Sequence, residues 1–115
     1  MKKHLSVLFL IVLAILTLSC EDKNEVLVEP NATLIWTGDY DLDGCGFFIE
    51  IDSVEYKAEN EEIIPPAFKV DHPLSVSIQY LDLLYDLDYY CGDSSEPNKA
   101  KAIKLTYMDL NGELK

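Results

Sequence analysis

The chain has 115 residues, and its 21 acidic residues against nine lysines and no arginine give a formal net charge of −12. This length has room for one small domain. Such acidity disfavours binding to nucleic acid and to anionic lipid head groups, and it favours divalent cations or basic partners. We therefore expect no nucleic-acid function; a second interpretation of the acidity is that it only keeps the domain soluble.

The first residues are typical of an export signal. Lys2 and Lys3 precede an apolar run, Leu5 to Leu18, that ends close to Cys20. A membrane-spanning helix needs about 20 apolar residues, so this run is too short for a permanent span. We expect a signal helix over residues 1–19, a polar flexible tether over 20–31 and the folded domain over 32–115.

The end of this leader resembles the signal peptides of bacterial lipoproteins, whose cysteine is alkylated by a diacylglycerol before cleavage. The resemblance implies that Cys20 begins the mature protein, that it carries acyl chains such as palmitate, and that they anchor the protein to a membrane of the cell envelope. We expect the outer membrane, on its periplasmic face or at the cell surface; the acidic residues that follow Cys20 resemble a surface-export signal, and in other lineages they mean retention at the inner membrane. Thr17 stands where that family usually has leucine. Small Thr17 and Ser19 also fit an ordinary secretory cleavage site, which would leave a soluble protein with a free N-terminal cysteine.

Two cysteines remain once Cys20 carries lipid. Export would place Cys45 and Cys91 in an oxidising compartment, so we expect a disulfide between them. Closing a loop of this length is worth roughly 4 kcal/mol in the chain-entropy model. Both cysteines adjoin glycine, which lets the backbone bend. A metal-binding thiolate pair is the alternative, but neither cysteine has a histidine near it in the sequence.

The remainder of the chain is predicted to form β-strands. Residues 46–52, 75–81 and 103–107 alternate apolar and polar side chains with a period of two, which is typical of half-buried strands. Residues 32–36 and 54–57 are shorter candidates, the second after a tight turn at Asp52-Ser53. Residues 81–90 fit either a strand or a helical face, and we favour the strand because its tyrosines continue into Cys91.

The connections complete this prediction. Pro65 and Pro66 exclude both a helix and a central strand, so residues 61–68 should be a connection that ends in a buried Phe68. Residues 93–98 should form a loop and residues 109–112 a terminal turn. Five or six short strands without a long helix predict an all-β domain, a small barrel or sandwich.

Several segments of this domain resemble a group of small, uncharacterised Gram-negative lipoproteins with a compact all-β domain. The resemblance covers most of residues 33–108. It implies an OB-like small barrel and no catalytic residues. It rests on Asp43-Gly44-Cys45-Gly46-Phe47, the strand Ile49-Glu50-Ile51-Asp52, the prolines and phenylalanine of 65–68, the alternating residues of 76–80, and Tyr90-Cys91-Gly92.

An acidic loop gives the one candidate metal site. Asp39, Asp41, Asp43, Gly44 and Glu50 match positions 1, 3, 5, 6 and 12 of the EF-hand calcium loop. An EF-hand needs a helix on each side, whereas both flanks here are predicted strands, so we reject that motif. We keep the hypothesis that Asp39, Asp41 and Asp43 bind calcium outside a helix pair; the alternative is a solvated acidic turn.

Other residues give little sign of catalysis. The serines lack a base and an orienting acid, and His72 lies in a turn between Asp71 and Pro73. We predict a membrane-anchored envelope lipoprotein without enzymatic activity, whose β-domain binds or supports another envelope component, a protein or a glycan. The alternatives are a calcium-binding β-module and a small hydrolase or inhibitor.

Overall fold

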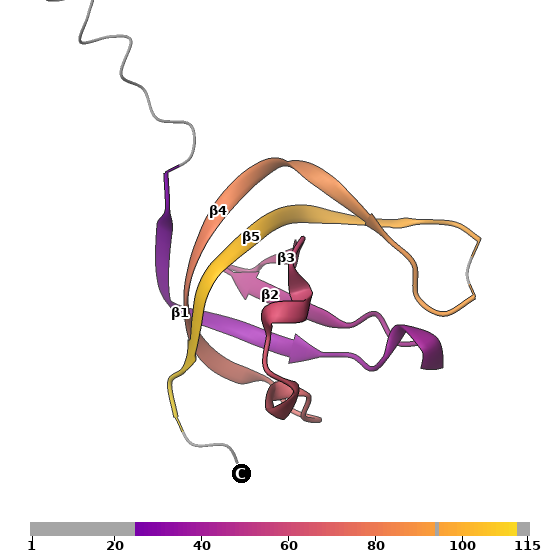
Figure 1. Cartoon of the computed structure of the whole chain (residues 1–115), viewed down its shortest axis with the longest axis horizontal. Helices are drawn as coiled ribbons and strands as arrows, with labels where there is room; N and C mark the ends of the chain where they lie inside the picture. The colour runs from indigo at the N-terminus through magenta and orange to yellow at the C-terminus, as the bar shows by residue number, and fades with distance from the viewer. Residues whose placement is uncertain (1–24, 94, 113–115) are drawn as a thin grey trace, which may run out of the picture.

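Five β-strands make up more than half of the residues that the computed structural model describes, which are 25–93 and 95–112 (Figure 1). The leader and Cys20 lie outside the described residues. Three short 3-10 turns lie between the strands. The elements in chain order are β1 Leu27–Trp36, η1 Tyr40–Leu42, β2 Phe47–Ile51, β3 Val54–Ala58, η2 Glu61–Ile63, η3 Pro66–Phe68, β4 Leu74–Tyr89 and β5 Asn98–Leu110.

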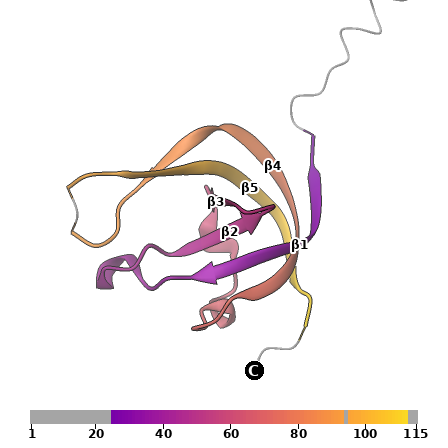
Figure 2. The same cartoon turned by 180° about the vertical axis from the view of Figure 1, so that it is seen from behind.

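The strands close into one barrel in the order β1-β2-β3-β5-β4. Strands β3 and β5 are parallel, and the other four neighbouring pairs are antiparallel. This arrangement is that of a small Greek-key barrel of the OB type. The expected all-β fold is confirmed, as a barrel of five strands and not a sandwich. Seen from both sides, the long β4–β5 hairpin arches over the shorter strands (Figure 1 and Figure 2).

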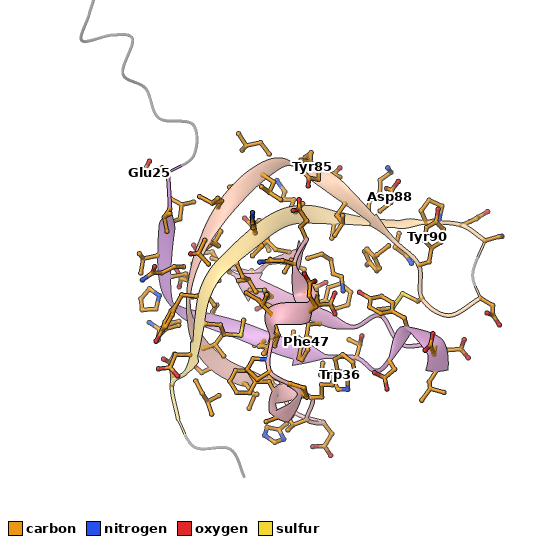
Figure 3. All side chains as sticks on the ribbon, in the orientation of Figure 1. Glu25, Trp36, Phe47, Tyr85, Asp88 and Tyr90 are labelled. Carbon is orange, nitrogen blue, oxygen red and sulfur yellow. A yellow bond between two sulfur atoms is a disulfide. The ribbon has the colours of Figure 1, made fainter. Side chains whose placement is uncertain are left out.

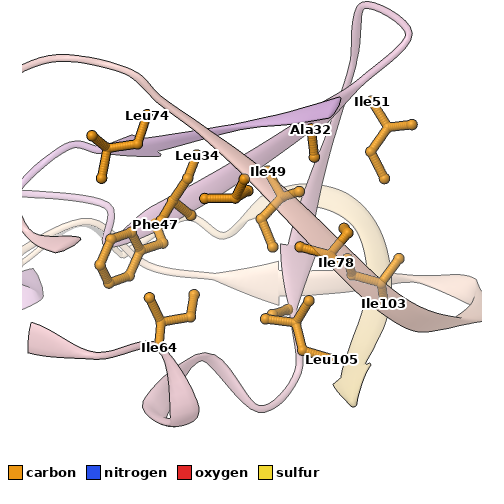
Figure 4. Packing of buried hydrophobic residues seen from close by; sticks show 12 residues of the cluster. Ala32, Leu34, Phe47, Ile49, Ile51, Ile64, Leu74, Ile78, Ile103 and Leu105 are labelled. Atoms are coloured by element: carbon orange, nitrogen blue, oxygen red, sulfur yellow. The ribbon is translucent and has the colours of Figure 1, made fainter. Parts of the chain in front are cut away.

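The barrel interior follows from the alternation of side chains along the strands. In β2, Phe47, Ile49 and Ile51 are buried while the residues between them are partly exposed. Every strand adds inward-facing residues of this kind, because successive side chains of a strand point to opposite faces. The buried apolar cluster comprises Ala32, Leu34, Phe47, Ile49, Ile51, Ala58, Ile64, Leu74, Val76, Ile78, Ile103 and Leu105 (Figure 4).

Strand β1 begins earlier than the sequence analysis expected. Leu27 pairs with Tyr80 and Glu29 with Ile78, so the predicted tether gives way to ordered strand five residues before Ala32. The register shifts between Glu29 and Ala32, at Pro30, which has no N–H to donate to the ladder. The prediction missed these pairs because the apolar run at residues 26–28 is short and lies between Glu25 and Glu29 in an otherwise polar stretch.

Strand β4 is a single element of 16 residues. It merges the strand expected over 75–81 with the segment 81–90, for which a strand was favoured over a helix. The register against β5 shifts between Asp82 and Asp86, and Leu84 has a φ of 60° within this irregular stretch. The long strand therefore bends there, which lets its far end reach the loop between β1 and β2.

The connection from β3 to β4 differs from the prediction in which of its side chains is buried. Ile64 is buried, whereas Phe68, the residue expected inside, is only half-buried and packs against the edge of the core. Figure 4 shows Ile64 near Phe47 at one end of the cluster. Pro65 and Pro66 turn the chain directly after Ile64, and this brings the isoleucine to the barrel opening in place of Phe68.

Candidate functional site

A disulfide joins two loops at one end of the barrel. Cys45 lies in the loop between β1 and β2, Cys91 follows β4 closely, and their sulfurs are bonded. In both views η1 and the far end of the β4–β5 hairpin lie at this same end of the molecule (Figure 1 and Figure 2). The predicted pairing is confirmed, and the bond holds the hairpin close to the loop that contains η1.

Beside this disulfide, Lys57 of β3 has its side chain buried, with 1% of the residue exposed. Its Nζ donates hydrogen bonds to the carbonyl oxygens of Cys45 at 2.6 Å and Phe47 at 2.8 Å, and to the Tyr40 hydroxyl at 2.7 Å. Glu61 Oε2 lies 3.2 Å from the same nitrogen. A buried ammonium is tolerated when it is paired and hydrogen-bonded, and four oxygens fulfil that condition here.

Three aromatic rings surround the rest of this ammonium. Lys57 Nζ lies 4.7 Å from the ring centre of Phe48, 5.1 Å from that of Tyr89 and 5.2 Å from that of Tyr40. The electron-rich face of such a ring attracts a cation within about 6 Å. Burial lowers the pKa of Lys57 below its ordinary value, and the Glu61 carboxylate opposes that shift.

Glu61 connects the turn η2 to both neighbouring segments. Its Oε1 accepts a hydrogen bond from the backbone N–H of Phe47 at 2.6 Å, and its Oε2 accepts one from the Tyr40 hydroxyl at 2.8 Å. Burial and the Glu61 carboxylate raise the pKa of Tyr40 well above its ordinary value. Both carboxylate oxygens therefore have fixed donors, and Glu61 holds η1, η2 and the start of β2 together.

A pocket of about 450 Å³ opens next to this network. It lies between the end of β1, the start of β2 and the connection η2–η3, where Figure 3 shows Trp36 and Phe47. These two rings are 4.7 Å apart between centres and tilted by 52°. The lining combines apolar and aromatic side chains with charged ones: Trp36, Asp39, Tyr40, Phe47, Glu61, Glu62, Ile64, Pro66 and Lys69.

Lys69 lies at the edge of this pocket. Its Nζ is 4.8 Å from the ring centre of Trp36 and 3.7 Å from Asp39 Oδ1. The side chain of Lys69 is 40% exposed and that of Asp39 is 57% exposed. Contacts this exposed are weak, because water screens both charges.

No family model, curated protein or solved structure matches this chain. The chemistry of the site is therefore inferred from its own residues. Across residues 25–93 and 95–112, no helix has the length and the apolar character of a membrane span. Cys20 precedes this part of the chain, so its lipidation stays a prediction.

The candidate calcium ligands lie around the turn η1 and are not gathered into one group in the described part of the chain. Asp39 precedes η1 and lies near Lys69, while Asp43 follows η1 with a φ of 68°. Within the described part of the chain, no three carboxylate, histidine or cysteine side chains are placed to share a metal ion. The structure thus does not bring Asp39, Asp41 and Asp43 together around one point.

The sequence analysis did not single out Lys57 or Lys69, and it included Glu61 only as the first residue of the connection 61–68. No local signal marks Lys57, because alternation over residues 54–57 places it with Glu55 on the polar side of the predicted strand. The structure keeps the other candidate, His72, on the surface beside Asp71. The disulfide and Asp39 are the features of this site that the sequence analysis had named.

Proposed function

We propose that this protein is exported, anchored to the cell envelope by lipid on Cys20, and works as a non-enzymatic binding module. The Cys45–Cys91 disulfide supports export, because such bonds persist in oxidising compartments and are rare in the cytosol. The short apolar leader that ends at Cys20 supports the anchor. A tethered barrel would present its pocket to other envelope components.

The anchor is tested by mass spectrometry of the native protein purified from membranes. The expected N-terminal peptide begins at Cys20 and carries the mass of a diacylglycerol, with or without a further acyl chain. An N-terminal peptide without acyl mass, or a leader that remains uncut, would contradict the proposal.

The pocket beside Trp36 is the observation that carries the binding function. Its volume falls within the range of about 300–1,000 Å³ that is usual for ligand pockets. It combines an apolar, aromatic lining with a few charged groups, as binding pockets commonly do. Glu61 is held there by Lys57, Tyr40 and the Phe47 N–H. Fixed partners of this kind suit a rigid binding surface better than proton transfer.

In-cell photo-crosslinking tests whether the pocket binds an envelope component. A photoreactive amino acid would replace exposed Glu62 in the pocket and, as a matched control, exposed Lys104 on β5, outside the pocket lining. We expect a discrete adduct from position 62 and none from position 104. Protease and glycosidase digestion of the adduct would distinguish a protein from a glycan. Equal labelling at both positions would contradict a binding role for the pocket.

A further inference from the structure

We propose that the pocket binds an alkylammonium group, the lysine side chain of a protein partner, and that Lys69 occupies the same position until that partner arrives. This inference rests on the proposed binding function and names the chemistry of its ligand. It follows from the contacts that Lys69 makes, from a second lysine nearby and from the charge around the pocket.

Lys69 shows which groups of the pocket attract a cation. Its ammonium lies over the Trp36 ring and near the Asp39 carboxylate, at 4.8 Å and 3.7 Å. An aromatic face next to a carboxylate is the usual environment for binding an ammonium, and tryptophan is the strongest of the aromatic partners. The pocket therefore already contains a cation site, with a residue of the same chain at it.

The two lysines differ in how firmly their ammonium groups are held. Lys57 is fixed in place, whereas Lys69 can be displaced by another ammonium group. Lys57 is held by two backbone carbonyl oxygens in addition to Tyr40 and Glu61, and it is almost fully buried. The ammonium of Lys69 has a single carboxylate partner, and its side chain is 40% exposed. Lys69 can thus leave its position without exposing a buried group or breaking the barrel.

The rest of the pocket has room and charge for an external lysine. Ile64 and Pro66 provide apolar surface for the methylene groups of the incoming side chain. The Glu62 carboxylate is exposed and makes no hydrogen bond or ion pair within the described residues, so it is free to pair with the ammonium group of the incoming lysine. The net charge of −12 also draws basic partners toward the protein.

Competition by Lys69 sets the size of the expected effect. An exposed cation–π contact favours the occupied arrangement by about two- to fivefold. The site is then open for an external ligand about a third to a sixth of the time, and the apparent affinity for that ligand is reduced by the same fraction. Replacing Lys69 with glutamine should therefore tighten binding of an external ammonium by about three- to sixfold.

Fluorescence of Trp36, the single tryptophan of the chain, measures this binding directly. The probes are acetyl-Leu-Lys-Leu-amide, the same peptide with glutamine in place of lysine, and spermidine. We expect a saturable change with the lysine peptide and little change with the glutamine peptide. Lys69→Gln should bind the lysine peptide more tightly and Glu62→Gln more weakly. Lys104→Gln, which removes the same charge outside the pocket lining, should bind it as the wild type does.

Two results would overturn the ligand assignment: equal affinity for the two peptides, or saturation by spermidine without binding of the lysine peptide. The role of Lys69 has its own readout without ligand, since ring current from Trp36 should shift its ε-methylene protons upfield in NMR spectra. Unshifted protons, or unchanged affinity in Lys69→Gln, would refute that role alone. A position-62 adduct that persists when the lysine peptide fails would leave the binding function standing and refute its ligand chemistry.

Discussion

Lys57 Nζ and Glu61 Oε2 lie 3.2 Å apart, four residues from one another in the sequence, where β3 gives way to the turn η2. The side chain of Lys57 is 1% exposed and that of Glu61 is 20% exposed. The pair also contacts η1 through Tyr40 and the start of β2 through Phe47. One ion pair thus holds together the segments that form the pocket wall.

Lys57→Met should destabilise the protein by about 3 kcal/mol, because the loss of one partner leaves the other charge of a buried pair without compensation. The carbonyl oxygens of Cys45 and Phe47 would also lose their donor. Chemical denaturation measures the change. Lys104→Gln, an exposed site, is the control and should alter the free energy of unfolding by less than about 0.5 kcal/mol. A similarly small loss in Lys57→Met would contradict the role of this ammonium.

The double variant Lys57→Met/Glu61→Gln should be more stable than the sum of the two single changes predicts. Glutamine removes the uncompensated charge, and its carbonyl oxygen can still accept a hydrogen bond from the Tyr40 hydroxyl or the Phe47 N–H. A double-mutant cycle from denaturation curves should give a coupling of about 1–3 kcal/mol, as is usual for residues in contact. Strict additivity would mean that the two residues act independently.

Cys45→Ser/Cys91→Ser should lower the free energy of unfolding by roughly 2–5 kcal/mol, because the bond joins residues 46 positions apart and so restricts the conformational entropy of the unfolded chain. The double replacement avoids a free thiol. Hydrogen exchange should then show faster opening at the far end of β4 and β5 than in β2, since the bond joins that end to the loop after β1. Uniform acceleration across the barrel would contradict this local role.

The strands could be predicted from the local alternation of side chains, and the disulfide from the number of cysteines. Period-two alternation marks the residues of β2, and the even cysteine count left after Cys20 pairs Cys45 with Cys91. Burial of Lys57 has no such local signal. It requires Tyr40, Phe48 and Tyr89, from three separate segments, to meet around one ammonium. That meeting depends on how the closed barrel brings the loops together.

The sequence also could not show that Ile64 is buried in the core in place of the expected Phe68, because this too depends on the path of the chain in space. The sequence places both apolar residues in one connection, on either side of Pro65 and Pro66. The direction in which the two prolines turn the chain decides which side chain enters the barrel. Alternation cannot show that direction, because the connection is not a strand.

Tyr40→Phe should change how stability depends on pH above about 10. The pKa of Tyr40 is raised in the folded protein by burial and by Glu61, so the folded state keeps its proton while the unfolded state loses it. The stability that the neutral phenol contributes is fully present below about pH 10 and is lost as pH rises toward the higher folded-state pKa. Denaturation at pH 8–11 should therefore show a stability difference between wild type and Tyr40→Phe that shrinks as pH increases. A constant difference would contradict the raised pKa.

Gly46→Ala should destabilise the barrel and disturb the pocket together. Gly46 has a φ of +71°, and an added Cβ would overlap the Glu61 carboxylate and the Tyr40 hydroxyl. A left-handed alanine costs about 1–2 kcal/mol by itself, and displacing Glu61 from the Phe47 N–H adds to that. We expect a loss of at least 2 kcal/mol in thermal or chemical unfolding, with a changed Trp36 emission in the folded state. Gly112→Ala, which meets no atom within 4 Å, is the matched control and should leave both quantities unchanged. Equal behaviour of the two variants would show that the contact of Gly46 with Glu61 and Tyr40 does not shape the site.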